Sequence, residues 1–277
     1  MRVFITGCKG QLGRALNEAL TGHTVAGCDL PKTDITDREA ITRAIEGFAP
    51  DVVIHTAAWT DVDGCARNPE KAYRVNGLGT QNVALACASS EAAMVTISTN
   101  EVFDGEASEP YQEWDPPHPI NPYARSKAAG EWFTRHLLTR FYIVRTAWLY
   151  APGGSNFPHR IIELADELGR LRVVTDEVSN PTFAPDLAAA LADLIETGAY
   201  GVYHLTNTGY TSRYDFAREI LHIAGRENVP VEKITLDAFE RGSTPPKFAP
   251  LANTAATALG IQLRPWQKAL AAFLEGD

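Results

Sequence analysis

A tyrosine and a lysine stand four residues apart at Tyr123 and Lys127, within the run Tyr-Ala-Arg-Ser-Lys. On a helix this spacing places both side chains on one face. A tyrosine hydroxyl has a reference pKa of about 10 and exchanges protons poorly at neutral pH. A nearby ammonium group stabilises the phenolate and lowers that pKa. The pair is therefore a candidate for proton transfer, with an exposed amphipathic helix face as the alternative.

Hydroxyl side chains follow an apolar run upstream, at Ser98 and Thr99. The run 93–98 predicts a buried strand, and ligands of open α/β sheets bind outside the carboxyl ends of strands. These hydroxyls can bind a substrate there, or they can satisfy local backbone groups.

Three glycines with the spacing G-x-x-G-x-x-G, Gly7, Gly10 and Gly13, follow the first apolar run. Glycines in a strand-to-helix turn let the backbone approach a pyrophosphate, and the helix N-terminus offers it free N–H groups. The spacing differs from the commoner G-x-G-x-x-G, and a tight turn needing positive φ is the alternative. Its position after a buried strand favours a dinucleotide site.

An acidic residue, Asp29, follows the second predicted strand. An acid there accepts hydrogen bonds from the adenosine ribose, which favours NAD. Lys32 lies three residues on and can instead accept a 2′-phosphate, so the choice between NADH and NADPH stays open. Asp34 and Ile35 begin the next loop and can border the adenine.

Strands and helices alternate along the first half. The sequence predicts strands at 2–6, 23–27, 51–55, 93–98 and 141–146, and helices at 11–20, 37–48, 69–89 and 123–138. Wholly apolar strands in this rhythm predict an α/β fold with a Rossmann-type, doubly wound parallel sheet.

The second half is less regular and predicts a smaller C-terminal substrate-binding lobe. Helices are expected at 156–168, 185–196 and 212–224, and strands at 171–174 and 200–205. The expected layout is an NAD(P)-binding domain at 1–150, to which later segments return, and a mainly substrate-binding lobe at 151–277.

Composition narrows the possible partners. The 277 residues carry a formal net charge of -9 without a Lys/Arg block, which argues against nucleic acid and anionic membrane. There is no apolar run of the ~18 residues that a membrane span needs. The four cysteines lack disulfide or metal spacing, and no metal-ligand pattern stands out. Because no export signal precedes the first strand, we expect a cytoplasmic protein with reduced thiols.

The combined motifs resemble the dTDP-4-dehydrorhamnose reductase family, within the extended short-chain dehydrogenase/reductase superfamily. The stretches that carry the resemblance are 7–13, 55–63, 75–76, 98–105, 122–127, 145–150, 156–157, 180–182, 259–261 and Trp266. The implied reaction is hydride transfer from NADPH or NADH to C4 of a nucleotide-linked 4-keto-6-deoxy sugar. The implied partner is that nucleotide sugar, and a homodimer is an open expectation.

The resemblance also implies residue roles. Tyr123 would donate a proton to the substrate carbonyl, Lys127 would tune Tyr123 and bind the nicotinamide ribose, and Thr99 would hydrogen-bond the carbonyl oxygen. The dinucleotide would contact Gly7, Gly10, Gln11, Leu12, Gly13, Asp29, Asp34, Ile35, Ala57, Ala58, Trp59, Asn76, Tyr123 and Lys127. The sugar nucleotide would contact Thr99, Asn100, Trp148 and Asn156.

Two departures from the family pattern concern the substrate. Asn100-Glu101 stands where the family usually has Asp-Tyr, which puts a possible negative charge near the sugar. The family's Arg-Pro-x-x-Ser-x-Leu segment corresponds here to 245–251, which has no arginine. Arg160 and Arg213 are alternative phosphate partners.

Two other interpretations remain open. The altered positions are compatible with a different extended reductase or an epimerase that acts on another nucleotide sugar. The chain also resembles the non-catalytic regulatory subunit of methionine adenosyltransferase, although its intact Thr99, Tyr123 and Lys127 argue for catalysis.

Overall fold

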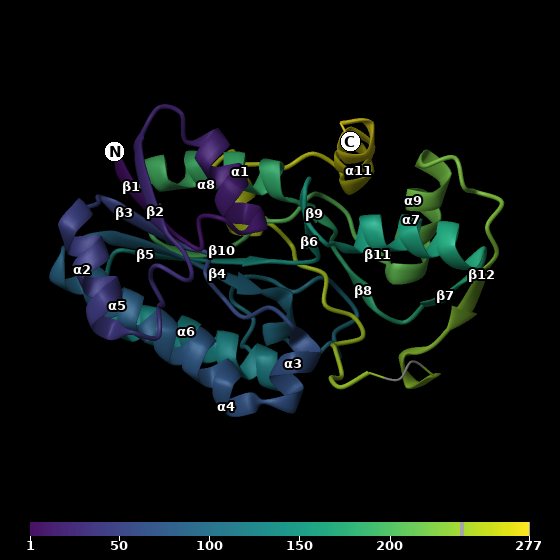
Figure 1. Cartoon of the computed structure of the whole chain (residues 1–277), viewed down its shortest axis with the longest axis horizontal. Coiled ribbons are helices and arrows are strands. Elements are labelled where there is room, and N and C mark those ends of the chain that lie inside the picture. The colour runs from purple at the N-terminus through teal and green to yellow at the C-terminus, as the bar shows by residue number, and fades with distance from the viewer. Residues whose placement is uncertain (239–240, 277) are drawn as a thin grey trace.

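A parallel sheet forms the larger part of the molecule. The computed structural model describes residues 1–238 and 241–276, and its main sheet has six strands in the order β2-β1-β3-β4-β5-β10 (Figure 1). These strands are β1 (Arg2–Thr6), β2 (Thr24–Cys28), β3 (Val52–His55), β4 (Ala93–Thr99), β5 (Phe141–Thr146) and β10 (Gly201–His204). Every neighbouring pair is parallel. The predicted α/β, Rossmann-type sheet is confirmed.

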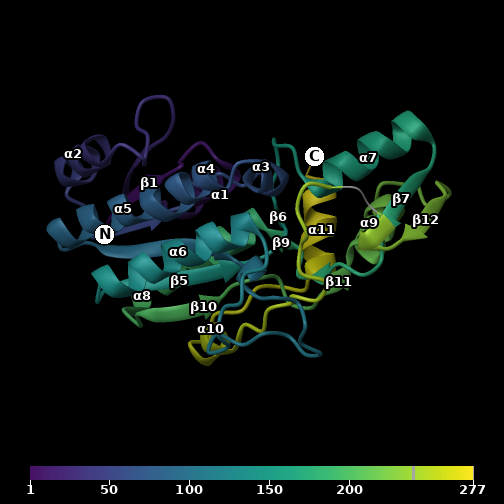
Figure 2. The ribbon, with the colours of Figure 1, turned by 90° about the horizontal axis from the view of Figure 1, so that it is seen from below.

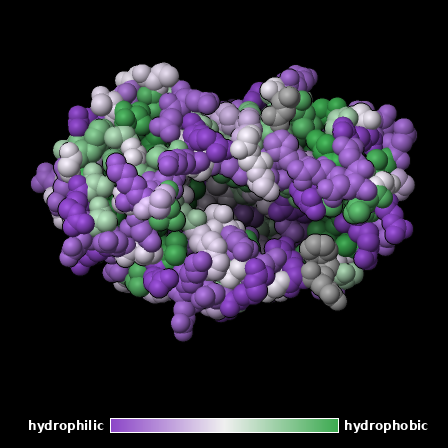
Figure 3. All heavy atoms as spheres, viewed as in Figure 1, coloured by the Kyte–Doolittle hydropathy of each residue, from purple (hydrophilic) through white to green (hydrophobic). Residues whose placement is uncertain are grey.

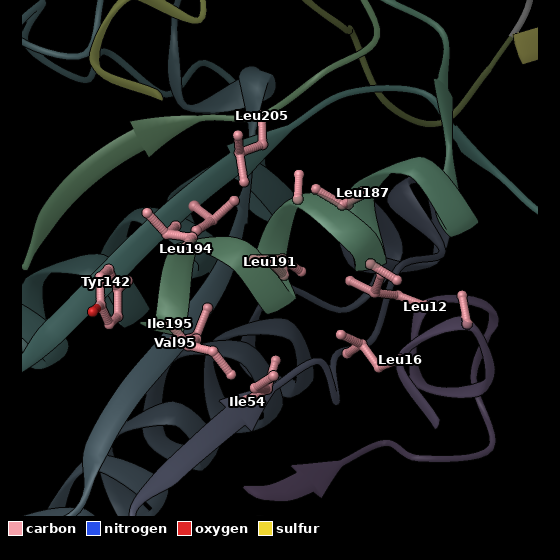
Figure 4. Packing of buried hydrophobic residues seen from close by; sticks show 14 of the residues in the cluster. Leu12, Leu16, Ile54, Val95, Tyr142, Leu187, Leu191, Leu194, Ile195 and Leu205 are labelled. Atoms are coloured by element: carbon pink, nitrogen blue, oxygen red, sulfur yellow. The ribbon is translucent and has the colours of Figure 1, made fainter. Parts of the chain in front are cut away.

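Helices cover both faces of this sheet (Figures 1 and 2). One layer contains α1 (Gln11–Ala19) and α8 (Ala184–Thr197), and the other contains α2 (Arg38–Phe48), α5 (Gly79–Ser89) and α6 (Pro122–Leu137). In the first layer, leucines of α1 and α8 pack on the buried faces of β3 and β4 (Figure 4). Burial of both sheet faces explains why these strands read as continuous apolar runs.

The predicted helix at 69–89 is present as a continuous helical segment whose centre is irregular. It begins as α4 (Pro69–Ala72), widens into a π-helical turn at Tyr73–Leu78, and continues as α5. The buried Asn76 lies within that turn. π-helical turns often occur at functional sites, and sequence periodicity does not reveal them.

The chain also contains shorter elements, which the sequence predicts only partly. Helices α7 (Phe157–Leu168) and α9 (Arg213–Ile223) and strand β7 (Leu171–Val174) agree with expectation. The elements without a sequence prediction are α3 (Val62–Arg67), β6 (Leu149–Tyr150), β8 (Val178–Ser179), β9 (Thr182–Phe183), β11 (Thr211–Ser212), β12 (Val231–Ile234), α10 (Thr254–Ala258), α11 (Trp266–Glu275), and the 3₁₀ turns Asn100–Val102 and Leu236–Ala238. Two-residue strands carry too little pattern to detect.

Between residues 1–238 and 241–276, no helix combines the length and apolarity that crossing a bilayer requires. The same residues contain no group of three or more His, Cys, Asp or Glu side chains arranged to hold a metal ion.

Candidate active site

Two adjoining cavities lie at the carboxyl ends of the central strands. One of about 390 Å³ extends over β2 and β3, and one of about 470 Å³ extends over β4 and β5; both include Gly10, Thr56 and Ala58. The chain leaves β1 toward β2 on one side and later returns to β3 on the other, so the cavities flank a topological switch point. Figure 3 shows this face of the molecule hollowed near its centre.

The glycine turn can receive a diphosphate. Gly7 has φ +71°, and a Cβ on Gly13 would lie 2.3 Å from the Gly7 carbonyl oxygen. Gly10 caps α1 without any side-chain hydrogen bond, so the first N–H groups of the helix face the space that both cavities share. A helix N-terminus without a side-chain cap is a ready anion site. These residues therefore fit a dinucleotide.

We expect Gly13→Ala to weaken dinucleotide binding at least ~10-fold and to destabilise the fold by about 1–3 kcal/mol, because the new methyl group must displace backbone. The contacts it would meet are backbone atoms of Gly7 and Cys8, which cannot rotate away. Titration with NADPH and urea unfolding measure the two effects. Gly22→Ala is the matched control, since a Cβ there meets nothing within 4 Å. Equal affinities in the two variants would contradict the expectation.

The first cavity has the composition of an adenosine site. Asp29, Asp34 and Ile35 line it, as the sequence analysis expects. Asp29 also ties the glycine turn to β2, because its carboxylate accepts hydrogen bonds from the Lys9 and Leu30 N–H groups, each at 2.8 Å. Lys32 is exposed and does not line this cavity. The positive charges that line the first cavity come instead from Lys71 and Arg74.

A buried polar network fixes the wall between the cavities. Asn76 holds the backbone of Trp59, accepting from its N–H at 2.7 Å and donating to its carbonyl at 3.0 Å. Asn76 also donates to the hydroxyl of Ser126, which donates to the carbonyl of Tyr123. The π-helical turn therefore connects Trp59 with the helix that carries the tyrosine.

The second cavity brings Thr99, Tyr123 and Lys127 together. Thr99 ends β4, and Asn121 caps α6 by accepting from the Ala124 N–H at 2.9 Å, which begins the helix just before Tyr123. The Thr99 hydroxyl donates to Asn100 Oδ1 at 3.3 Å, and its proximity to Tyr123 lowers the pKa of that phenol. Lys127, one turn further along α6, donates from Nζ to the Ile97 carbonyl at 2.6 Å.

Burial dominates the protonation of this set. It raises the pKa of Tyr123, with a further increase from the negative charge of Glu101 and a decrease from the neighbouring Thr99 hydroxyl. Burial lowers the pKa of Lys127 to about 8, against the opposing effect of Glu131. The sequence analysis expects Lys127 to lower the pKa of Tyr123, whereas in this structure that pKa is raised. Desolvation of the phenol sets the direction of the shift, and Tyr123 stays protonated at neutral pH.

An aromatic and cationic surface closes the far side of the second cavity. Trp148 has φ +42°, an uncommon conformation for a residue with a side chain and one that concentrates at functional sites. The Arg213 guanidinium carbon lies 3.6 Å from the centre of the Trp148 ring. Arg213 Nε donates to Glu177 at 3.0 Å. Arg213 thus presents positive charge to the cavity, whereas Arg160 pairs with Glu163 and does not line it.

Three residues that the resemblance assigns to ligands do not line either cavity. Gly13 packs under the turn, Asn76 supports Trp59, and Asn156 caps α7 by accepting from the His159 N–H at 3.1 Å. The other assigned residues do line the cavities: Gly7, Gly10, Gln11, Leu12, Asp29, Asp34, Ile35, Ala57, Ala58, Trp59, Thr99, Asn100, Tyr123, Lys127 and Trp148.

Sequence reasoning missed several lining residues. Lys71 and Arg74 carry no motif that separates them from ordinary surface residues, and Thr56 and Val62 lie within the stretch 55–63 but received no role there. A further cation, Arg241, lies beside the site, with its guanidinium 3.4 Å from Asp63 and 3.8 Å from Glu177. It reaches this place through a long connection from the C-terminal part, which no local pattern predicts.

A glycine turn shaped for a diphosphate adjoins hydroxyls that can protonate a carbonyl oxygen. That combination places the chain in the class of NAD(P)-dependent reductases built on a Rossmann sheet. Its sequence matches the model of one family, described as the RmlD substrate binding domain, over residues 1–276. The chain belongs to this family.

Relatives cover nearly the whole chain. The spore coat polysaccharide biosynthesis protein SpsK of Bacillus subtilis (strain 168) is 35% identical over 276 residues, 99% of this chain and 97% of that protein. A dTDP-4-dehydrorhamnose reductase of Mycolicibacterium smegmatis is 37% identical over 275 residues, 97% of this chain and 84% of that protein. The crystal structure of dTDP-4-dehydrorhamnose reductase from Bacillus anthracis str. Ames in complex with NADP has a TM-score of 0.96 and 36% identity, covering 100% of this chain and 99% of that one.

Proposed function

We propose that the chain reduces the C4 carbonyl of a nucleotide-linked 4-keto-6-deoxy sugar, using NADPH or NADH. The substrate that we propose is dTDP-4-dehydrorhamnose and the product dTDP-rhamnose, by analogy with relatives that carry this activity in their names. The observation that carries the proposal is that Thr99, Tyr123 and Lys127 line one cavity together with Gly10 of the glycine turn.

Residues of the glycine turn would hold the dinucleotide. The N-terminus of α1 receives the diphosphate beside Gly10, and Asp29 borders the adenosine. Lys127 would bind the nicotinamide ribose, as the resemblance implies. When bound, the reduced nicotinamide supplies the hydride.

Tyr123 acts as the general acid in this proposal. Its raised pKa keeps the phenol protonated, so that it can donate to the carbonyl oxygen as negative charge develops there. Thr99 donates a hydrogen bond to the same oxygen. Lys127 stabilises the phenolate that the transfer leaves behind, because its ammonium group is buried nearby in a medium that screens charge poorly. Arg213, stacked on Trp148, offers a partner for the substrate diphosphate.

The proposal is tested with the purified protein, freshly generated dTDP-4-dehydrorhamnose, and each reduced dinucleotide in turn. Loss of reduced-dinucleotide absorbance together with dTDP-rhamnose in the mass spectrum and chromatogram is the expected result. If the protein reduces other 4-keto nucleotide sugars but not dTDP-4-dehydrorhamnose, the reaction class stands and the proposed sugar or base is wrong. Tight dinucleotide binding without any keto-sugar turnover would overturn the proposal.

We expect the reduction rate to be constant near neutral pH and to fall above about pH 8, where Lys127 loses its proton. The direction follows because only the protonated form stabilises the phenolate of Tyr123. Tyr123 itself does not titrate in that range, since burial raises its pKa. A pH profile of kcat measures the effect. A rate that stays constant through about pH 9 would contradict this role of Lys127.

A further inference from the structure

Glu101 supplies the single carboxylate among the described residues that line the second cavity. The two positive charges of this lining are Lys127 and Arg213. The proposed reaction gives Lys127 a place at the dinucleotide and Arg213 a place at the diphosphate. It gives Glu101 no part, although withdrawing a carboxylate even partly from water is costly unless a partner satisfies it.

One oxygen of Glu101 is fixed and the other is available. Oε2 accepts a hydrogen bond from Asn121 Nδ2 at 2.7 Å. Asn121 cannot turn away, because its Oδ1 caps α6 and its Nδ2 also reaches the Thr244 carbonyl at 3.2 Å. For Oε1, the described part of the chain offers no hydrogen-bond partner, and the residue lines the cavity.

The carboxylate adjoins the pair of hydroxyls that would bind the carbonyl oxygen. The N–H of Glu101 donates to Thr99 Oγ1 at 3.2 Å, and the negative charge of Glu101 raises the pKa of Tyr123. Burial raises the pKa of Glu101 itself, as does Glu177, while Asn121, Arg241 and Arg213 lower it. A ligand group near the reacting carbonyl therefore meets an acceptor that is already oriented.

We propose that Glu101 selects the sugar by accepting a hydrogen bond from a hydroxyl or amino group on the ring carbon next to the reacting carbonyl. This inference rests on the proposed function. In a 4-keto-6-deoxy sugar the C5 neighbour carries a methyl group, so the donor adjacent to C4 is the substituent on C3. The substrate class is then a nucleoside diphosphate sugar with a 3-hydroxyl or 3-amino group.

A purely structural role for Glu101 predicts a different change in ligand affinities when Glu101 is replaced. Glu101 orients Asn121, and Asn121 caps the helix that carries Tyr123. Loss of that support would affect every ligand of the cavity alike. Loss of a selective hydrogen bond affects only ligands that carry the 3-substituent. Glu101→Gln keeps an oxygen that can accept from Asn121, whereas Glu101→Ala removes both functions.

The test measures binding rather than turnover. Three probes are titrated calorimetrically into protein saturated with oxidised dinucleotide: dTDP, a dTDP-6-deoxyhexose with a 3-hydroxyl group, and its 3-deoxy counterpart. The wild type should prefer the 3-hydroxyl sugar by ~10–100-fold, the range expected for a hydrogen bond to a charged group. Glu101→Ala should reduce this preference to below ~3-fold while dTDP affinity is unchanged. A 3-amino probe should bind the wild type at least as tightly as the 3-hydroxyl sugar.

Glu106→Gln is the matched control, because Glu106 lies on the same loop but is exposed and outside the cavity. It should keep the wild-type preference. An unchanged preference in Glu101→Ala, with dTDP still bound, would overturn the inference and leave the proposed function standing. Equal weakening of all probes in Glu101→Ala, with Glu101→Gln close to the wild type, would assign Glu101 a positioning role through Asn121 and also overturn the inference. If the wild type binds no probe, the nucleotide-sugar function fails, and the inference fails with it.

Discussion

Tyr123→Phe is expected to lower kcat by ~10²–10⁴-fold, the usual contribution of a general acid. The substitution removes the hydroxyl that acts as the general acid in the proposal and leaves the ring in place. That ring packs against Cys65 and Ala72, so the fold should be little affected. Steady-state kinetics with the keto sugar measures the loss. Titration with NADPH should show dinucleotide affinity close to the wild type.

Tyr150→Phe is the matched control for this prediction. Tyr150 is also buried, it does not line the second cavity, and its hydroxyl finds no hydrogen-bond partner within the described residues. The same chemical change there should leave kcat within a few-fold of the wild type. Removal of an unsatisfied buried hydroxyl is nearly neutral or stabilising. A large loss in both variants would mean that a phenol-to-phenyl change disturbs the fold. Retained activity in Tyr123→Phe would remove Tyr123 from the mechanism.

The sequence predicts the parallel sheet well because both faces of that sheet are buried. Strands such as β1 and β5 have the residue bounds that their apolar runs suggest, and Asp37 caps α2 by accepting from the Ala40 N–H. The glycine turn and the Tyr123 helix also carry local signals. Each of these features is encoded within about ten neighbouring residues, which is the range over which periodicity and capping act.

The remainder of the site depends on contacts between distant segments. The sequence cannot show that Asn156 caps its own helix, because cap and ligand roles favour the same residue type. It also cannot place Arg241 beside Asp63, since 178 positions separate them. The pKa of Tyr123 has the same origin: the spacing to Lys127 is a local signal, but the burial that raises the pKa comes from the whole fold.

A buried ion pair beneath the site leads to the second large effect. Arg145 of β5 and Glu131 of α6 form a bidentate pair, with Nε to Oε1 at 2.9 Å and Nη2 to Oε2 at 2.8 Å. Their side chains are 0% and 4% exposed. Ser98 also donates to Glu131 at 2.6 Å, so the pair connects the strand end beside Thr99 with the helix of Tyr123 and Lys127.

Arg145→Met is expected to lower the free energy of unfolding by about 3–5 kcal/mol, because it removes the bidentate partner of a buried carboxylate and leaves it only the longer contact to Arg135, at 3.6 Å. Urea unfolding followed by circular dichroism measures the loss. The double variant Arg145→Met/Glu131→Met should recover most of it, since replacing both members of a buried pair by apolar groups is often neutral. A double variant that is as unstable as the single variant would show that packing around Arg145, rather than the unpaired charge, carries the effect.

In the double variant, the free energy of unfolding should recover while the pH dependence of kcat should still change. Glu131 raises the pKa of Lys127 against the burial that lowers it. With Glu131 replaced, Lys127 should lose its proton at lower pH, and the alkaline fall in kcat should begin below about pH 8 although the fold is restored. A pH profile unchanged from the wild type would confine Glu131 to a structural role. A shifted profile in a stable protein would identify Glu131 as a positioning residue that keeps Lys127 charged.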